Sequence, residues 1–317
     1  MLANLAFSLN IVAPWILMAA IGLLLRRLGI VNEAFLSKGN RVVFLVFLPS
    51  MLFASIYGSE LGESFDLGFI IFVAAWTILS FLAIWALSLL LIKDRNVISA
   101  FVQGSCRSNV GALAVPLAFS VLGDGAVKSV LALAVLIPIY NIMCIVLLAV
   151  YNKKEDKQMS IAGVLVSIAK NPSIISIALG IAFSLIGISL PTFINSTINS
   201  FAQVTVPLVL VLLGASITFK SIDGKFKYAI YSGLIKVVAM PVAVTLLAYL
   251  FGFRGNDLAI LMLLNGVPTA IAGYVMVTEM GGDSDVASSN IMLTTILSAF
   301  TLAIFIFVFA LLGIIVN

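Results

Sequence analysis

Two stretches of the sequence combine groups that could bind an anion with residues that interrupt a helix. Their polar, glycine and proline residues are Arg107, Ser108, Asn109, Gly111 and Pro116 in the first stretch and Asn265, Gly266, Pro268 and Thr269 in the second. Proline removes a backbone donor, and glycine weakens a helix further. In a membrane, backbone groups freed in this way are tolerated only inside the protein or beside a water-filled cavity. Interrupted segments at matching positions of two halves of a chain therefore indicate a binding site.

For one such stretch alone, a simple kink would be the better interpretation, because membrane helices often contain proline and glycine. The pair favours a site, because an asparagine comes a few residues before the proline in both stretches. We expect Asn109 and Asn265 to offer amides, and Ser108 and Thr269 to offer hydroxyls. Asn141 and Gln103 are further candidates, for which polar bonding between helices is an equally good interpretation.

Two cations lie deep in apolar stretches. Arg107 comes twelve residues after Arg95, which is about 18 Å along a helix at ~1.5 Å per residue. A cation in the membrane normally has a partner or a function, and the 13 acidic residues all fall near predicted ends or loops. Arg107 without a resident counter-ion would suit an anionic ligand, and bonds to backbone carbonyls are the alternative. Lys236, nine residues after Lys227, is expected to extend its ammonium back to the headgroups.

The composition requires a membrane around these residues. The 317 residues are 62% hydrophobic and 9% charged, and the mean hydropathy is +1.24. Soluble domains carry about 25% charged residues. The net charge of +4 lies in scattered loop residues, so we expect no nucleic-acid partner. There is no histidine, and the two cysteines form no metal or disulfide pattern, so we expect neither an enzyme nor a cofactor.

The elements that must position the two stretches are about ten membrane-spanning helices. The expected spans are 5–25, 35–57, 66–92, 97–122, 126–151, 161–187, 191–218, 227–251, 257–279 and 286–316. The sequence thus predicts an all-α integral membrane protein with five helices in residues 1–151, a connecting loop at 152–160 and five helices in residues 161–317. An odd number of spans per half makes the repeats inverted, with the two interrupted stretches in spans four and nine.

The loops also indicate an orientation. Apart from Arg107 and Lys236, only Lys128 and Arg254 of the 17 basic residues fall at outer ends if the N-terminus is outside. Because basic residues concentrate on the cytoplasmic side, we expect both termini outside the cell membrane and the central loop in the cytoplasm.

Four motifs in order along the chain resemble the auxin efflux carrier family. They are Arg107–Gly111 leading to Pro116–Ala118, Pro138–Asn141, Pro268–Ala270 leading to Glu279–Asp283, and Thr294–Ser298. The resemblance covers essentially the whole chain. It implies two inverted five-helix repeats in which two broken helices cross, a fold shared with plant PIN carriers and bile acid:sodium symporters. It also implies a possible homodimer, and bacterial relatives are described as permeases for malonate or similar acids. Ala303 departs from the family pattern, which often has proline there.

The predicted function is therefore a secondary active transporter that carries a small organic anion, such as a carboxylate, by alternating access. The coupling ion stays open between sodium, proton and none. Sodium could bind near Asn109, Asn265 and Thr269, because hard cations prefer oxygen ligands. A channel is the main alternative, and an intramembrane enzyme is a weaker one, because a nucleophile, base or metal cluster would be needed.

Overall fold

A computed structural model of the chain is all-helical over the residues that it describes. Those residues are 2–57, 66–151, 166, 169, 170, 172–216 and 225–315, and they contain one isolated β-bridge and no strand. The predicted connecting loop at 152–160 lies outside them. The all-α prediction is confirmed for the described part of the chain.

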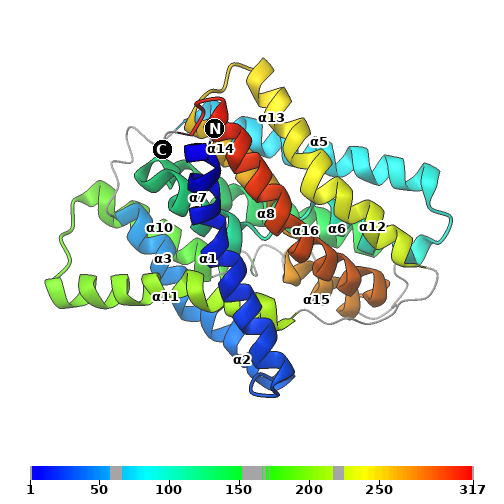
Figure 1. Ribbon diagram of the computed structural model, residues 1–317, viewed down its shortest axis with the longest axis horizontal. Helices are drawn as coiled ribbons and strands as arrows, with labels where there is room; N and C mark the ends of the chain where they lie inside the picture. Colours follow the sequence, from blue (N-terminus) through cyan, green and yellow to red (C-terminus); the bar gives the residue numbers. More distant parts are fainter. Residues whose placement is uncertain are drawn as a thin grey trace.

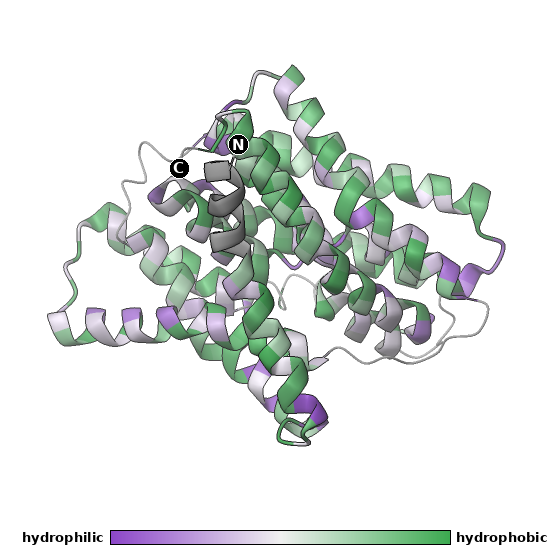
Figure 2. Cartoon of the chain, viewed as in Figure 1, coloured by the Kyte–Doolittle hydropathy of each residue, from purple (hydrophilic) through white to green (hydrophobic). Residues whose placement is uncertain are grey.

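The described helices are apolar over most of their surface, as expected for a protein in lipid (Figure 2). Six of them are long and apolar enough to cross a membrane. They are Glu33–Tyr57, Leu67–Leu91, Val110–Tyr151, Thr192–Ser216, Phe226–Leu250 and Ser284–Leu311. The prediction of ten spans in two inverted repeats is finer than this finding and stays a prediction.

The helices pack in two groups (Figure 1). The first group consists of α1 (Leu2–Arg27), the continuous segment α2 (Glu33–Val42), η1 (Val43–Phe47) and α3 (Leu48–Tyr57), and helices α10 (Pro172–Ile186) and α11 (Thr192–Ser216). Within it α11 packs on both α1 and α3. Helices α1 and α11 approach so closely that a Cβ on Gly214 would overlap the Ala19 carbonyl, and one on Gly22 would overlap the Val211 carbonyl. Glycine is therefore required at this crossing because no side chain fits.

The second group holds both stretches identified in the sequence. It consists of α5 (Leu67–Leu91), α6 (Arg95–Cys106), η2 (Val110–Ala114), α7 (Val115–Leu122), η3 (Gly123–Ala126), α8 (Val127–Tyr151), α12 (Phe226–Leu234), η4 (Ile235–Ala239), α13 (Met240–Leu250), α14 (Asn256–Gly266), α15 (Ile271–Glu279) and α16 (Ser284–Leu311). Helix α16 also packs on α1 of the first group. Buried Leu52 and Leu212 of the first group share one apolar core with Leu133 and Leu263 of the second.

A wide π turn precedes a proline in three of these segments. The turns η1, η2 and η4 end two residues before Pro49, Pro116 and Pro241. In each, the N–H of the residue before the proline donates to the carbonyl five residues back. A proline inside a regular helix would clash with the carbonyl four residues earlier, and the wider turn makes room for its ring. The helix therefore continues through the proline but rotates the residues of the turn.

Two clusters of charges join the second group of helices at opposite ends of α5. At its start, Lys128 lies 3.1 Å from Asp66 and 2.9 Å from Asp257. At its far end, Lys225 lies 2.7 Å from Asp283 and 3.4 Å from Asp94. These six residues are the Lys128 cluster (Asp66, Lys128, Asp257) and the Lys225 cluster (Asp94, Lys225, Asp283).

Several of the aspartates also cap helices. Asp66, Asp94 and Asp283 accept backbone N–H groups at the starts of α5, α6 and α16. The Phe69 N–H first, and then the Lys128 ammonium, lower the pKa of the Asp66 carboxyl. The Asp283 carboxylate raises the pKa of Lys225. Each cluster thus combines one lysine with two aspartates at helix starts, where negative charge is favourable.

Replacing Gly214 or Gly22 by alanine is expected to destabilise the protein by about 1–3 kcal/mol, because an added Cβ overlaps a backbone carbonyl that cannot move alone. Gly233→Ala is the matched control, since its Cβ would meet nothing closer than Thr294 Cγ2 at 3.7 Å. Thermal unfolding of the purified protein in detergent measures the effect. Equal melting temperatures for the Gly214 and Gly233 variants would contradict the close approach.

Asp66→Asn is expected to lower the melting temperature at neutral pH, because the amide keeps the shape of the cap and loses the ion pair with Lys128. The pKa of Asp66 is lower in the folded protein, so its stabilisation is complete above the unfolded value of about 3.9 and disappears as pH falls through the folded value. The difference from wild type should therefore shrink in acid. Asp124→Asn, at an exposed position outside the cluster, is the control. A difference that is independent of pH would refute the ion pair.

Candidate functional site

The backbone leaves the helical conformation in both stretches identified in the sequence. Helix α6 ends at Cys106, and helical turns resume at Val110 in η2. Helix α14 ends at Gly266, and α15 begins at Ile271. The residue before Pro268 is extended, with a ψ of 157° at Val267, as expected before a proline. The predicted breaks in both segments are present.

The two extended segments cross and pair with each other. Ser108 and Thr269 form an isolated antiparallel bridge. The Asn109 N–H donates to the Pro268 carbonyl at 3.0 Å, and the Ala270 N–H donates to the Arg107 carbonyl at 3.1 Å. Each break therefore supplies partners for backbone groups that the other break exposes, as the interior of a membrane requires.

Side chains satisfy more of the backbone at this crossing. The Thr269 hydroxyl donates to the Gly104 carbonyl at 2.6 Å, and the Thr269 N–H donates to Thr294 Oγ1 at 3.2 Å. On Asn265, the side-chain oxygen accepts from Trp76 Nε1 at 3.0 Å, and the amide nitrogen donates to the Leu261 carbonyl. The amide of Asn265 is thus occupied within the protein.

A cavity of about 380 Å³ lies against one side of the crossing. The first break with the turn after it, Arg107–Ala112, and the end of the second break with the turn after it, Ala270–Ala272, contribute to its wall. The rest of the wall comes from α2, η1, α3, α8, α10 and α11, so both groups of helices enclose it. Its size falls in the range of ~300–1,000 Å³ typical of small-molecule sites.

Arg107 provides the charge at this cavity. Its side chain is 7% exposed, and its guanidinium donates to Asn141 Oδ1 at 3.0 Å and to Met276 Sδ at 2.8 Å. Among the side chains that the structure describes, no carboxylate lies within ion-pair distance of it. Its described partners are neutral, so the described part of the cavity wall is positive.

Lys236 is buried at the crossing, and the predicted extension of its side chain to the headgroups is wrong. It is 0% exposed, and its Nζ donates to Ser108 Oγ at 2.7 Å and to the Asn265 carbonyl at 2.5 Å. Counting residues gives the position of Lys236 along the helix axis, but it does not give the face of the helix from which the side chain extends. The π turn η4 contains Lys236, and an extra residue in a turn changes the face on which a side chain emerges.

The structure divides the predicted site residues among three places. Arg107, Ser108, Asn109, Gly111 and Asn141 line the 380 Å³ cavity. Asn265, Gly266, Thr269 and Pro116 are buried around the crossing without lining that cavity, and Pro268 lines a second pocket. Gln103 is 1% exposed, and its amide has no hydrogen-bond partner among the described residues. Contact of any of these residues with a substrate stays a prediction.

Several polar residues of the cavity or crossing were not predicted as site residues. Asn40, Tyr140 and Ser173 line the cavity, and Trp76, Lys236 and Thr294 bond to residues of the two breaks. Tyr140 lies next to Asn141 in the family motif Pro138–Asn141, and that motif could have identified it as a site residue. Asn40 and Trp76 lie in otherwise ordinary helices, and no local pattern distinguishes them.

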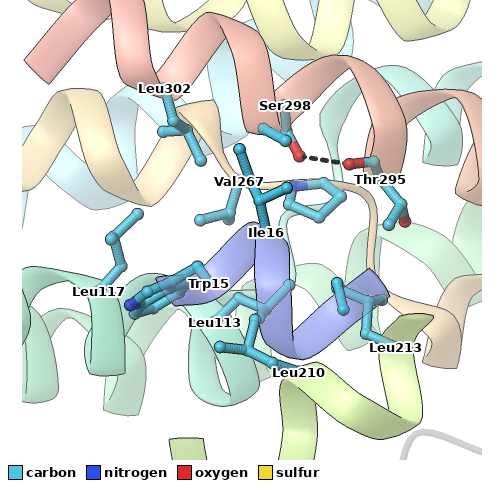
Figure 3. A pocket seen from close by; sticks show the side chains of 13 residues that line it. Trp15, Ile16, Leu113, Leu117, Leu210, Leu213, Val267, Thr295, Ser298 and Leu302 are labelled. Atoms are coloured by element: carbon cyan, nitrogen blue, oxygen red, sulfur yellow. Dashed lines mark hydrogen bonds between the residues drawn. The ribbon is translucent and has the colours of Figure 1, made fainter. Parts of the chain in front are cut away.

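A second, smaller pocket of about 70 Å³ lies beside the second break, between α1, α7, α11 and α16. Figure 3 shows Trp15 and Ile16 of α1 facing Val267 of the second break and Leu302 of α16. Its labelled lining is apolar except for Thr295 and Ser298, whose hydroxyl donates to the Thr295 carbonyl (Figure 3). The paired breaks thus adjoin both a small apolar pocket and the 380 Å³ cavity, which contains Arg107 and other polar side chains in a mostly apolar wall.

Comparisons with known proteins agree on one class. A family model described as membrane transport protein matches residues 7–306. An uncharacterized transporter of Methanothermobacter thermautotrophicus is 26% identical over 93% of this chain and 96% of its own. One of Methanocaldococcus jannaschii is 23% identical over 93% and 97%. A Rhizobium meliloti protein named "Putative malonate transporter" is 25% identical over 83% of each chain.

Thr269→Val is expected to destabilise the protein by about 1–3 kcal/mol, because it removes a buried donor to the Gly104 carbonyl with little change of shape. Thr278→Val is the matched control. Its exposed hydroxyl bonds the Tyr274 carbonyl of the same helix, α15. Thermal unfolding in detergent compares the two, and a larger loss at Thr278 would show that the paired breaks do not depend on this bond.

Proposed function

Because the chain belongs to the membrane transport protein family, which is the auxin efflux carrier family, we propose that it carries a small organic anion across the membrane by alternating access. The observation that carries the proposal is Arg107 in the wall of the 380 Å³ cavity. The relative named for malonate makes a short-chain mono- or dicarboxylate the first substrate to test.

The local electrostatics support an anion. The first turn of α15, Ile271 and Ala272, and the first turn after the other break, Val110–Ala112, both line the cavity. A helix start carries a partial positive charge and N–H groups without helical partners, which attract carboxylates. With the Arg107 guanidinium, three positive features act on the same volume. Asn109 and Asn141 add amides that could orient a bound carboxylate.

The two cavities and the two groups of helices support alternating access. In the proposed orientation, with both termini outside a cell membrane, Asn40 of α2 lines the 380 Å³ cavity toward the cytoplasmic side, and the small pocket adjoins the middle of α1 and α16. Movement of the second group against the first would enlarge one space at the expense of the other. The crossing moves with the second group, so a bound anion would travel with its own site.

The Lys128 and Lys225 clusters support the proposed inverted repeats of residues 1–151 and 161–317. Asp66, Lys128 and Asp257 precede or begin spans three, five and nine. Lys225, Asp283 and Asp94 hold the same places in spans eight, ten and four. Exchange of the two halves therefore maps the positions of one cluster onto those of the other, with lysine and aspartate exchanged at two of the three positions. A homodimer remains an expectation from the family.

Arg107→Ala is expected to weaken malonate binding roughly 10- to 100-fold, since hydrogen bonds to charged groups contribute about 1.5–3 kcal/mol. Arg95→Ala is the matched control, because Arg95 is exposed at the other end of α6. Ligand-induced thermal shifts of purified protein and uptake by proteoliposomes give the two measurements.

Both measurements are made with malonate and with a series of other mono- and dicarboxylates as ligands and substrates. Saturable uptake that Arg107→Ala lowers and Arg95→Ala leaves unchanged supports the proposal. Equal uptake by wild type and Arg107→Ala refutes the site, and a flux that does not saturate with substrate favours a channel.

A further inference from the structure

The most unusual group at the crossing is the ammonium of Lys236. It is completely buried, and its two described partners are oxygens of the two different broken segments, Ser108 Oγ and the Asn265 carbonyl. No described carboxylate lies within ion-pair distance of it. A buried cation without a counter-ion is costly, so a specific local environment must stabilise it.

The helix ends provide that environment. Asn265 is the penultimate residue of α14, so its carbonyl belongs to the negative end of that helix. Helix α6 ends two residues before Ser108, which puts a second negative helix end at the crossing. Carbonyl oxygens at such ends and hydroxyl oxygens are the ligands that bind metal cations in transporters with interrupted helices.

Two of the three residues near which the sequence predicts sodium, Asn265 and Thr269, already bond within the protein. The Asn265 carbonyl accepts from Lys236, and the Asn265 side-chain oxygen accepts from Trp76. The Thr269 hydroxyl is directed at the Gly104 carbonyl. A lysine ammonium is a compact charge with three donors, so it can satisfy oxygens that would otherwise surround an ion.

We propose that Lys236 is a tethered cation that takes the place of a coupling ion at the crossing, so that the protein binds and moves its anion without sodium. The ammonium of Lys236, which belongs to η4, bonds to both broken segments. It is part of the chain, so it does not have to bind from solution as a free ion would. This inference rests on the proposed function for its transport consequence, but the cation site itself is testable without a substrate.

The substrate-free test uses the melting temperature of purified Lys236→Ala, which removes the ammonium and leaves space. The variant is expected to melt below wild type in choline chloride and to recover part of the loss in methylammonium or sodium chloride. Lys227→Ala is the matched control, because Lys227 lies in the same segment with an exposed side chain. The cation site is overturned if neither methylammonium nor sodium raises the melting temperature of Lys236→Ala by more than it raises that of Lys227→Ala.

The transport test uses malonate uptake by proteoliposomes in sodium, potassium and choline media. Wild type is expected to show the same uptake in all three media. The Lys236→Met variant keeps most of the buried volume, and its malonate uptake is expected to fall more than about tenfold below that of wild type. Uptake by wild type that requires sodium, or wild-type uptake by Lys236→Met in choline, overturns the proposal. Absence of uptake and of thermal shift with every carboxylate would instead refute the proposed function, and the melting experiment would still decide the cation site.

Discussion

The whole arrangement depends on two chain breaks that satisfy each other deep inside an apolar protein. An interrupted membrane helix exposes backbone donors and acceptors that lipid cannot bind. Here the bridge between Ser108 and Thr269 pairs the two interruptions, and the bonds from Asn109 and Ala270 flank it. Neither break would be tolerable alone, so the second group of helices must hold α6–α7 and α14–α15 in one fixed relation. The close packing of that group and its charge clusters follow from this requirement.

The paired breaks also create the electrical character of the site. Four half-helices end or begin at one point, so two negative ends and two positive ends lie close together. Lys236 bonds to a carbonyl at a negative end, whereas the positive starts of η2 and α15 border the cavity with Arg107. The two buried cations therefore have different environments. Lys236 is enclosed by protein oxygens, and Arg107 has neutral partners that a stronger anionic ligand could replace.

Much of this was predictable from sequence because the responsible signals are local. The spacing of Asn109 and Pro116, and of Asn265 and Pro268, located both breaks, and the depth of Arg107 followed from its distance from Arg95. The partner of each break was not predictable, because the register between residues 108 and 269 depends on tertiary packing. The direction of Lys236 was missed for a similar reason. Its distance from Lys227 gives its position along the helix but not the face on which it lies, and the π turn shifts that face.

Wider turns account for three of the prolines within helices, whereas Pro14, Pro138 and Pro207 lie in regular helices. Pro49, Pro116 and Pro241 each follow a π turn, and each turn contributes residues to the cavity or the crossing: Val43 and Phe44 from η1, Val110 to Ala112 from η2, and Lys236 from η4. A regular helix offers one apolar face to its neighbours, and a wider turn presents an additional position without ending the span. Proline keeps that turn in place because a regular helical turn would clash with its ring. In this protein the helix-breaking residues therefore act in two ways, opening two helices completely at the crossing and widening one turn in three segments, one of which is the first opened helix.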